Sequence, residues 1–265
     1  MTASADCVAA IVGSAFTLEL LAPLNPTPES VDTPHGTWTL HRLAALDRPA
    51  YVSFRHGFPH ARLPHQIPYR AQAAALQSAG CGALLVTSSV GVLAPELPLY
   101  TPLVVGDLLT MDNRLPDGSA CTMFARPSDR HGHLVLDDGL FSSALTDAVR
   151  AHLPPATPDA AVTFGYVGGP RGKTAAENRM WARLGADVNS MTLAPEVILA
   201  NELEIPCAGL VVGHKYSVPG RANPASDADV QQTLDDSRAA LRQAVTDVLQ
   251  QVDPMPFGNH LFRFD

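Results

Sequence analysis

The segment FRHGFPHARLPHQIPYRA, residues 54–71, gathers imidazole, guanidinium and phenol side chains directly after a predicted strand. In open α/β sheets, ligands bind outside the carboxyl ends of the strands, so the segment is predicted to be a ligand-binding loop. A metal site is the alternative, but no carboxylate cluster accompanies the histidines, and we expect no metal. The side chains concerned are Arg55, His56, His60, His65, Tyr69 and Arg70.

Other predicted strands also end in small polar residues: Gly13-Ser14, Thr87-Ser88-Ser89 and Met191-Thr192. Hydroxyls and backbone N–H groups at such turns can cradle a phosphate, and Arg55 would add a bidentate positive charge. Taken singly, such a serine or threonine is more often a helix cap or a turn residue than a phosphate ligand. Together they predict an anion site at one edge of the sheet.

Familiar nucleotide-binding motifs are incomplete in this chain. The stretch VGGPRGKT, residues 167–174, resembles a phosphate-binding P-loop, but Val167 stands where the first glycine belongs. No GxGxxG run is present either. We therefore expect neither a nucleoside triphosphate site nor a nicotinamide cofactor.

Apolar runs that are typical of buried strands alternate with helical patterns, a βαβ rhythm. This predicts a single α/β domain over residues 1–265, with a mixed, mostly parallel central sheet flanked by helices. A long final helix is expected at about residues 227–251, and the Pro-rich stretches 25–36, 152–159 and 218–227 are predicted loops. Strands are predicted within 8–16, 49–57, 81–91, 101–111, 160–169 and 205–216, and the other helices within 70–80, 141–153, 174–185 and 194–203.

Composition limits the possible partners. The chain has 265 residues, 46% apolar residues and a formal net charge of −8, so nucleic acid and anionic membranes are poor partners. The four widely spaced cysteines are predicted to be reduced core thiols. A basic leader and a membrane span are both lacking in the sequence, so a cytoplasmic protein is expected.

In order along the chain, six motif blocks resemble the trimeric purine nucleoside phosphorylase and methylthioadenosine phosphorylase family, especially its bacterial methylthioinosine-type members. The resemblance covers nearly the whole chain. It implies a nucleoside phosphorylase-like fold and a pentosyltransferase of purine metabolism. The blocks are IVGSAF, RHGFPHARLPHQIPYRA, VTSSVGVL, VVGDLLTMDN, GGPRGKTAAENRM and GADVNSMTLAPEVILANEL.

The resemblance also implies roles for individual residues. Met191 would lie against the ribose, and His60 would be the histidine that a neighbouring subunit contributes near the sugar. A homotrimer with active sites at its subunit interfaces follows from the resemblance alone, with inorganic phosphate as co-substrate and no cofactor. The implied phosphate site consists of Ser14, Arg55, His56, Ser88, Ser89 and Thr192.

The base side departs from the family pattern. Gly172 replaces a stacking aromatic residue, and Lys173 replaces a residue that is acidic in purine-specific relatives. Lys215 falls on the residue that contacts purine N7, and Ser217 on a later aspartate. Lys173 and Lys215 are the only lysines in the chain, and two cations would suit a base rich in carbonyls or one that carries a carboxylate. The alternative is that both are solvent-facing loop lysines.

The expected reaction is phosphate-dependent cleavage of the N-glycosidic bond of a purine-type or 5′-modified nucleoside. Lys215, as general acid to the leaving base, and His56 are the catalytic candidates. Val12 and Ala15 stand where relatives prefer glycine, so a nucleoside hydrolase of the same fold is an alternative. A non-catalytic nucleoside- or phosphate-binding protein is another, because fold does not guarantee function. The sequence leaves the base and the 5′ substituent open.

Overall fold

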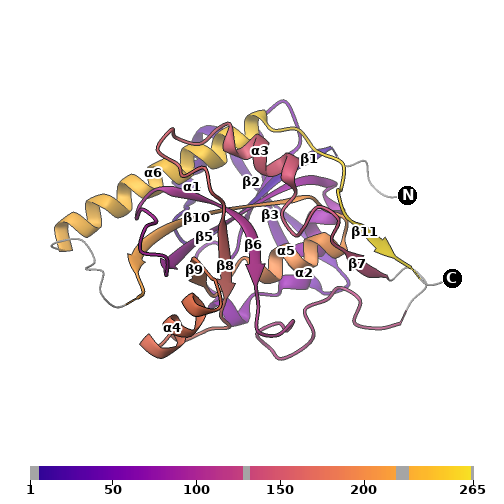
Figure 1. Ribbon diagram of the computed structural model, residues 1–265. Coiled ribbons are helices and arrows are strands. Elements are labelled where there is room, and N and C mark those ends of the chain that lie inside the picture. The colour runs from indigo at the N-terminus through magenta and orange to yellow at the C-terminus, as the bar shows by residue number, and fades with distance from the viewer. Residues whose placement is uncertain (1–5, 128–131, 219–226, 264–265) are drawn as a thin grey trace.

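Strands and helices alternate along the chain in the computed structural model, which describes residues 6–127, 132–218 and 227–263 (Figure 1). The strands are β1 Cys7–Val12, β2 Pro26–Thr33, β3 Gly36–Leu43, β4 Ala50–Phe54, β5 Cys81–Val92, β6 Pro102–Leu109, β7 His133–Val135, β8 Val162–Tyr166, β9 Val188–Ser190, β10 Cys207–Tyr216 and β11 His260–Phe262. The α-helices are α1 Leu18–Leu21, α2 Tyr69–Ser78, α3 Ser143–Arg150, α4 Ala175–Arg183, α5 Ala194–Glu202 and α6 Asp227–Gln251, and the 3₁₀ helices are η1 Ala22–Leu24 and η2 Pro64–Gln66.

The large sheet has the strand order β10-β6-β8-β9-β5-β1-β4-β3-β2, and β10 also pairs with β5. This extra pairing closes one end of the sheet into a ring of strands. Strand β1 is parallel to β4 and β5, β5 to β10, and β8 to β6 and β9. The pairings β2–β3, β3–β4, β5–β9 and β6–β10 are antiparallel. The predicted class, a single α/β domain with a mixed central sheet, is confirmed.

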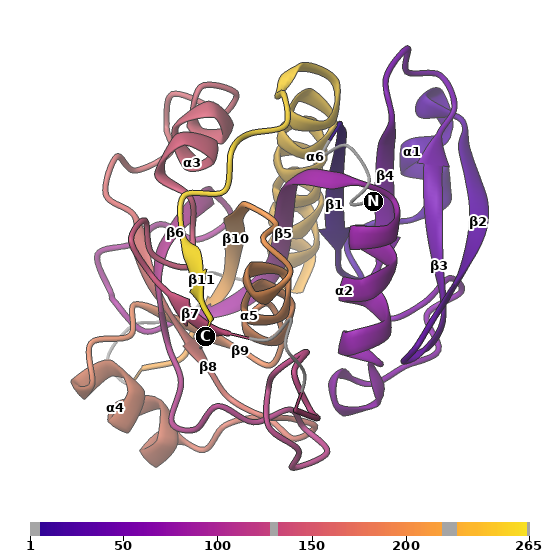
Figure 2. The same cartoon turned by 90° about the vertical axis from the view of Figure 1, so that its right-hand side faces the viewer.

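Apolar side chains of alternate residues cover both faces of the sheet. In β1, Cys7, Ala9 and Ile11 pack in the core cluster that contains α2 and α5. The residues between them pack in a second cluster, together with α1, α3 and α6. Figures 1 and 2 show α6 on the opposite side of the strands from α2 and α5. Strands that are buried on both faces explain the near-continuous apolar runs in the sequence.

The prediction of a loop over residues 25–36 is wrong. Pro26–Thr33 forms β2, which pairs with β3 in an antiparallel hairpin at the edge of the sheet. An edge strand tolerates proline, because the missing N–H can face away from the neighbouring strand. Residues 152–159 form turns, as predicted, whereas most of the predicted loop at 218–227 lies outside the described residues.

Two other predictions are confirmed. Helix α6 spans Asp227–Gln251 and buries Leu241, Val245 and Leu249 against the sheet. All four cysteines are buried and free. Among the described residues, no helix combines the length and the apolar character that a membrane crossing would need.

Candidate active site

Four neighbouring strands, β9, β5, β1 and β4, carry the predicted phosphate-binding side chains, inside β5 and just beyond the ends of the other three. Ser14 lies in the turn after β1, and Arg55 follows the last residue of β4. Ser88 belongs to β5, and Thr192 follows β9. Because these strands are adjacent in the sheet, residues from distant parts of the sequence meet at one edge.

The hydroxyl groups at this edge contact one another directly. Ser88 Oγ lies 3.0 Å from Thr192 Oγ1, and both side chains are buried. Ser89 points to the other face of β5 and is exposed, and its carbonyl accepts a hydrogen bond of 2.9 Å from Ser190 Oγ. The two serines of β5 therefore present their hydroxyls on opposite sides of the strand.

Arg55 is buried at the centre of this edge. Its Nε atom forms a hydrogen-bonded ion pair with Glu196 of α5, and Nη2 donates to the carbonyl of Thr87 at 2.8 Å. A Cβ atom placed on Gly13 would lie 3.3 Å from Arg55 Nη1. Glycine at this position therefore lets the turn after β1 approach the guanidinium closely.

His56 lies next to Arg55, and its ring is oriented by the loop that follows. Its Nδ1 is 2.8 Å from the carbonyl oxygen of Arg62, which can only accept, so Nδ1 carries the proton and Nε2 is a hydrogen-bond acceptor. Burial, and secondarily the charge of Arg55, lowers the pKa of His56 to about 4. The imidazole is therefore neutral at physiological pH.

His60 stacks on His56 of the same chain, with ring centroids 4.4 Å apart. It is exposed, so its predicted contribution to a neighbouring subunit's site stays a prediction. Rings of His56 and His60 line a cavity of about 210 Å³ that also contacts Gly13, Ser14 and Phe54. The proposed ligand loop and the turn after β1 thus face the same space.

A second cavity of about 210 Å³ lies between the strand ends and α6. Ser14 and Ser89 line it together with His214 of β10 and Arg238 of α6. Since Ser14 also lines the cavity beside His56, the two spaces meet at this serine. The space beside Ser14 and Ser89 therefore extends toward β10 and α6.

The two lysines of the chain lie close to each other beyond His214. Burial, and then the charge of Lys215, lowers the pKa of Lys173 to about 8. The pKa of His214 is lowered by burial first and by Lys215 and Lys173 next. Lys173 is half-buried, while Lys215 at the end of β10 is exposed. The charges of the two lysines therefore act on each other and on His214, which lines the second cavity.

Of the other two residues predicted on the base side, Ser217 packs against β5, whereas Gly172 has open space around it. Lys215 pairs with Gly91 of β5, and a Cβ atom on Gly91 would overlap Ser217 Oγ. Ser217 therefore packs on β5 beside Lys215. A Cβ on Gly172 would meet no atom within 4 Å, so the space around this loop residue is open.

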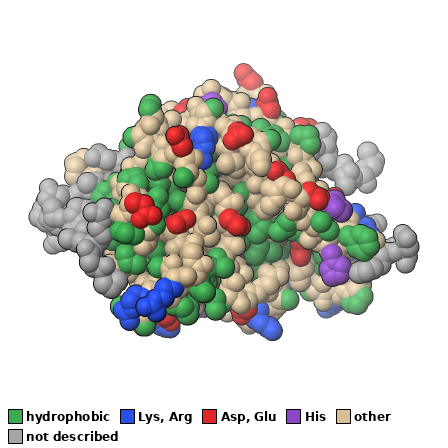
Figure 3. All heavy atoms as spheres, viewed as in Figure 1, with side chains coloured by type: hydrophobic (Ala, Val, Ile, Leu, Met, Phe, Trp, Pro, Cys, Tyr) green, Lys and Arg blue, Asp and Glu red, His purple; other side chains and the backbone are tan. Residues whose placement is uncertain are grey.

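The loop that resembles a P-loop instead begins α4. Thr174 caps the helix through a reciprocal capping box with Glu177, and Arg171 forms an ion pair with Glu177 at 2.7 Å. Figure 3 shows Lys and Arg side chains gathered where α4 lies, and Arg171, Arg179 and Arg183 are exposed there. Lys173 therefore directly precedes the N-cap residue of α4, which fixes its backbone position.

Met191 lies between the strand ends and the loop after β8. A Cβ atom on Gly169 would come within 2.9 Å of Met191 Sδ and 3.6 Å of Pro64 Cβ. Met191 precedes Thr192, whose hydroxyl belongs to the cradle. The predicted ribose-contacting methionine is therefore held next to the anion site.

Three residues of this region were missed by sequence reasoning: Glu196, His214 and Arg238. Glu196 gave a signal, since it is a carboxylate beside the apolar run Val197–Ala200 of the same helix, where burial demands a charged partner. The other two carried no such signal, because only the fold brings β10 and α6 to Ser14.

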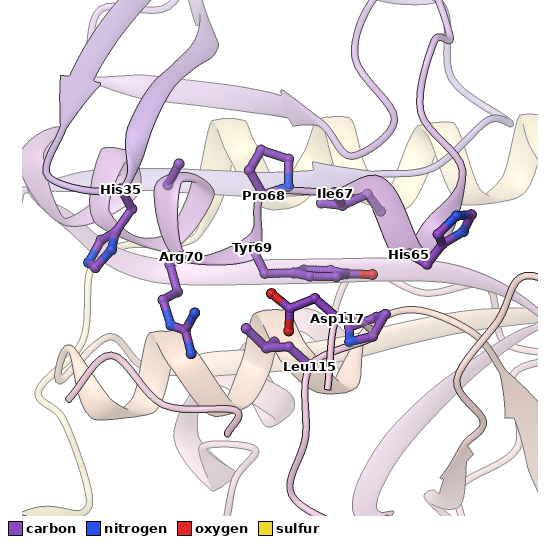
Figure 4. A pocket seen from close by; sticks show the side chains of 10 residues that line it. His35, His65, Ile67, Pro68, Tyr69, Arg70, Leu115 and Asp117 are labelled. Carbon is purple, nitrogen blue, oxygen red and sulfur yellow. The ribbon is translucent and has the colours of Figure 1, made fainter. Parts of the chain in front are cut away.

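Another cavity, of about 240 Å³, lies at the start of α2, away from the cradle (Figure 4). His35, His65, Tyr69 and Asp117 line it, and Arg70 donates there to the carbonyls of Thr122 and Ala120. Three residues of the predicted ligand loop, His65, Tyr69 and Arg70, therefore line this separate cavity. In the described part of the chain, no group of three or more His, Cys, Asp or Glu residues could hold a metal ion.

Several known proteins are similar to this chain in sequence or in fold. S-methyl-5′-thioadenosine phosphorylase of Thermofilum pendens is 28% identical, with 86% of each chain covered. A probable 6-oxopurine nucleoside phosphorylase of Dictyoglomus turgidum is 30% identical, with coverage of 86% of this chain and 85% of that one. The structure of methylthioadenosine phosphorylase from Schistosoma mansoni with adenine superposes with a TM-score of 0.76 at 21% identity, over 92% of this chain and 90% of that one.

These relatives confirm the expected resemblance. Residues 8–250 match the Phosphorylase superfamily, a range that includes every predicted site residue from Ser14 to Ser217. The match covers more than half of the chain, and a relative at 30% identity covers most of it. The chain belongs to the Phosphorylase superfamily.

Proposed function

We propose that this protein is a nucleoside phosphorylase, which uses inorganic phosphate to cleave the N-glycosidic bond of a purine-type or 5′-modified ribonucleoside. One phosphate oxygen forms a bond to C1′ while the bond from C1′ to the base nitrogen breaks. The products are the free base and a ribose 1-phosphate. The convergence of Ser14, Arg55, Ser88 and Thr192 on one edge of the sheet is the observation that carries this proposal.

In this proposal the cradle binds phosphate beside a sugar that becomes cationic as the base departs. Ser14, Ser88 and Thr192 donate hydroxyl hydrogen bonds, and Arg55 supplies the charge. The Ser89 hydroxyl lies on the other side of β5 and is not assigned to the same anion. His56, neutral and with Nε2 free to accept, would take a hydrogen bond from the protonated oxygen of monohydrogen phosphate. The negative phosphate stabilises the sugar cation and then captures it.

At the other end of the substrate, Lys215 would donate a proton to the departing base nitrogen, and Lys173 and Ser217 would contact the base. Two ammonium groups close together favour a base rich in carbonyls or one that carries a carboxylate. Met191 would contact the ribose, with Gly172 leaving room beside the base and His60 near the sugar. We further propose a cytoplasmic homotrimer that needs inorganic phosphate and no other cofactor.

The test is a base-release assay on a diverse nucleoside panel, with and without phosphate. The relatives named above act on methylthioadenosine or 6-oxopurine nucleosides by their names, so both classes belong on the panel together with acidic-base nucleosides. Phosphate-dependent release with formation of ribose 1-phosphate supports the proposal. Preferred cleavage of adenosine or methylthioadenosine, with the 6-oxopurine and acidic-base nucleosides inert, would contradict the proposed base preference.

A further inference from the structure

Arg55 and Glu196 form a fully buried ion pair, with residue exposures of 1% and 2%. Glu196 lies on α5 among apolar residues, 141 positions after Arg55 in the sequence. Burying an unpaired charge is very costly, so each of these residues needs the other while the site is empty. The pair is electrically neutral as a unit.

The guanidinium of Arg55 is only partly occupied by protein acceptors. Nε donates to Glu196, and Nη2 donates to the Thr87 carbonyl. Within the described residues Nη1 has no hydrogen-bond partner, and it faces Gly13, next to Ser14. The unoccupied edge of the guanidinium is therefore the edge that the cradle presents to an incoming anion.

The carboxylate of Glu196 is also only partly satisfied. Its Oε2 atom is buried, with no hydrogen-bond partner in the described part of the chain. Burial first, and the charge of Glu196 next, raises the pKa of Tyr69 and of Tyr166 well above the usual range. The negative charge is therefore felt through this apolar region, and a phosphate bound at Nη1 would feel it as well.

We propose that Glu196 is a resident counter-ion that sets the affinity of the Arg55 site for phosphate. While phosphate is absent, Glu196 neutralises the buried guanidinium and holds it in place. When phosphate binds, the nearby carboxylate opposes it, so both phosphate and a sugar phosphate product leave readily. This inference rests on the proposed phosphate site and assigns Glu196 a positioning role outside direct substrate contact.

Glu196→Gln tests the inference, because the amide oxygen can still accept from Arg55 Nε while the charge is removed. Inorganic phosphate is titrated into the full-length protein by calorimetry, and Tm is measured with and without phosphate. We expect lower Tm without phosphate, a larger rise in Tm with phosphate than in the unsubstituted protein, and a phosphate Kd reduced about tenfold or more.

Glu202→Gln is the matched control. Glu202 lies on the same helix, and its carboxylate accepts hydrogen bonds from Thr122 Oγ1 and from the Met123 amide. This substitution should change Tm equally with and without phosphate and leave the phosphate Kd unchanged. If Glu196 had a purely structural role, Glu196→Gln would likewise change Tm equally with and without phosphate and leave the phosphate Kd unchanged. In the counter-ion role, the lower Tm without phosphate comes together with a lower phosphate Kd.

The outcomes separate this inference from the proposed function. If the unsubstituted protein binds phosphate and Glu196→Gln binds it equally or more weakly, the counter-ion role is overturned and the phosphate site stands. If the unsubstituted protein binds no phosphate, both are overturned. Should Glu196→Gln not fold, Glu196→Asp keeps the charge at a greater distance from Nε. A gain in phosphate affinity that is smaller than the gain expected for Glu196→Gln then supports the inference, and no gain overturns it.

Discussion

Ser88 and Thr192 are 104 residues apart in the sequence, and their hydroxyl oxygens lie 3.0 Å apart in the fold. Both are buried at the meeting point of β5 and the segment after β9. Ser88 Oγ also donates to the Ser89 carbonyl at 3.2 Å, so the hydroxyl pair is held in place by β5. A phosphate oxygen beside both hydroxyls could accept a charge-assisted hydrogen bond from each, provided that their mutual hydrogen bond is given up.

Thr192→Val should raise the KM for phosphate because it removes one hydroxyl and keeps the side-chain shape. A hydrogen bond to a charged group contributes about 1.5–3 kcal/mol, so we expect a loss of roughly tenfold to a hundredfold in kcat/KM for phosphate. Thr146→Val on α3 is the matched control, since Thr146 Oγ1 is buried with no partner among the described residues. Equal kinetics in both variants would argue against a phosphate contact at Thr192.

Arg55→Ala should remove phosphate dependence and also destabilise the fold. Glu196 would be left buried without its counter-ion, and breaking a buried pair costs about 3–5 kcal/mol. Steady-state kinetics against phosphate and urea unfolding measure the two effects. Arg48→Ala, which removes a surface pair with Asp253, is the control. An unchanged phosphate-dependent rate in Arg55→Ala would dismiss the assigned role of this side chain.

The pKa of His56 makes stability depend on pH. Burial lowers this pKa from 6.5 to about 4, so the unfolded chain binds a proton more readily than the fold does. The stability that depends on His56 is complete above pH 6.5 and is lost as the pH falls through about 4. Urea unfolding at pH 7, 5 and 4 should show a shallower decline for His56→Gln than for the unsubstituted protein. Parallel declines would contradict this.

Lys215→Ala should change both base preference and the titration of Lys173. Removing the neighbouring charge raises the pKa of Lys173 from about 8 toward the ordinary lysine value. The preference for carbonyl-rich or acidic bases over adenine should fall roughly tenfold or more, since a charge-assisted contact is lost. Arg179→Ala on the exposed side of α4 is the control for a general change in surface charge. Unchanged substrate ratios would show that Lys215 does not face the base.

Gly169→Ala should displace Met191, because the added Cβ would lie 2.9 Å from its Sδ atom. A flexible side chain can move, so the fold should survive. We expect a higher KM for the nucleoside and a smaller change in the KM for phosphate. Gly172→Ala is the matched control, since a Cβ there meets no atom within 4 Å. Equal effects on both KM values would contradict the assignment of Met191 to the ribose.

Much of the fold could be predicted from the sequence, because β1, β4, β5, β8 and β10 are short apolar runs separated by helical patterns. The hairpin of β2 and β3 could not be predicted, since Pro26 and Pro28 are typical of loops and no residue of β2 is fully buried. Strand β9, with only three residues, is too short for any periodicity to show.

The sequence could predict those site residues that are polar or charged and that directly follow a predicted strand. Ser14, Arg55 and Thr192 satisfied that rule, and the fold brings them to one edge. His65, Tyr69 and Arg70 belong to the same predicted loop after β4, yet they line the separate cavity at the start of α2. Arg238 of α6 lies far from Ser14 in the sequence and lines the same cavity only because of the fold, so no local sequence pattern could reveal it.

The most direct test of the central claim is product analysis with a cleaved nucleoside. Base release is followed with and without inorganic phosphate, and the sugar product is identified by phosphorus NMR. The account predicts that release requires phosphate and yields one ribose 1-phosphate for each base. Release without phosphate, with free ribose as the sugar product, would contradict it and would identify water as the acceptor.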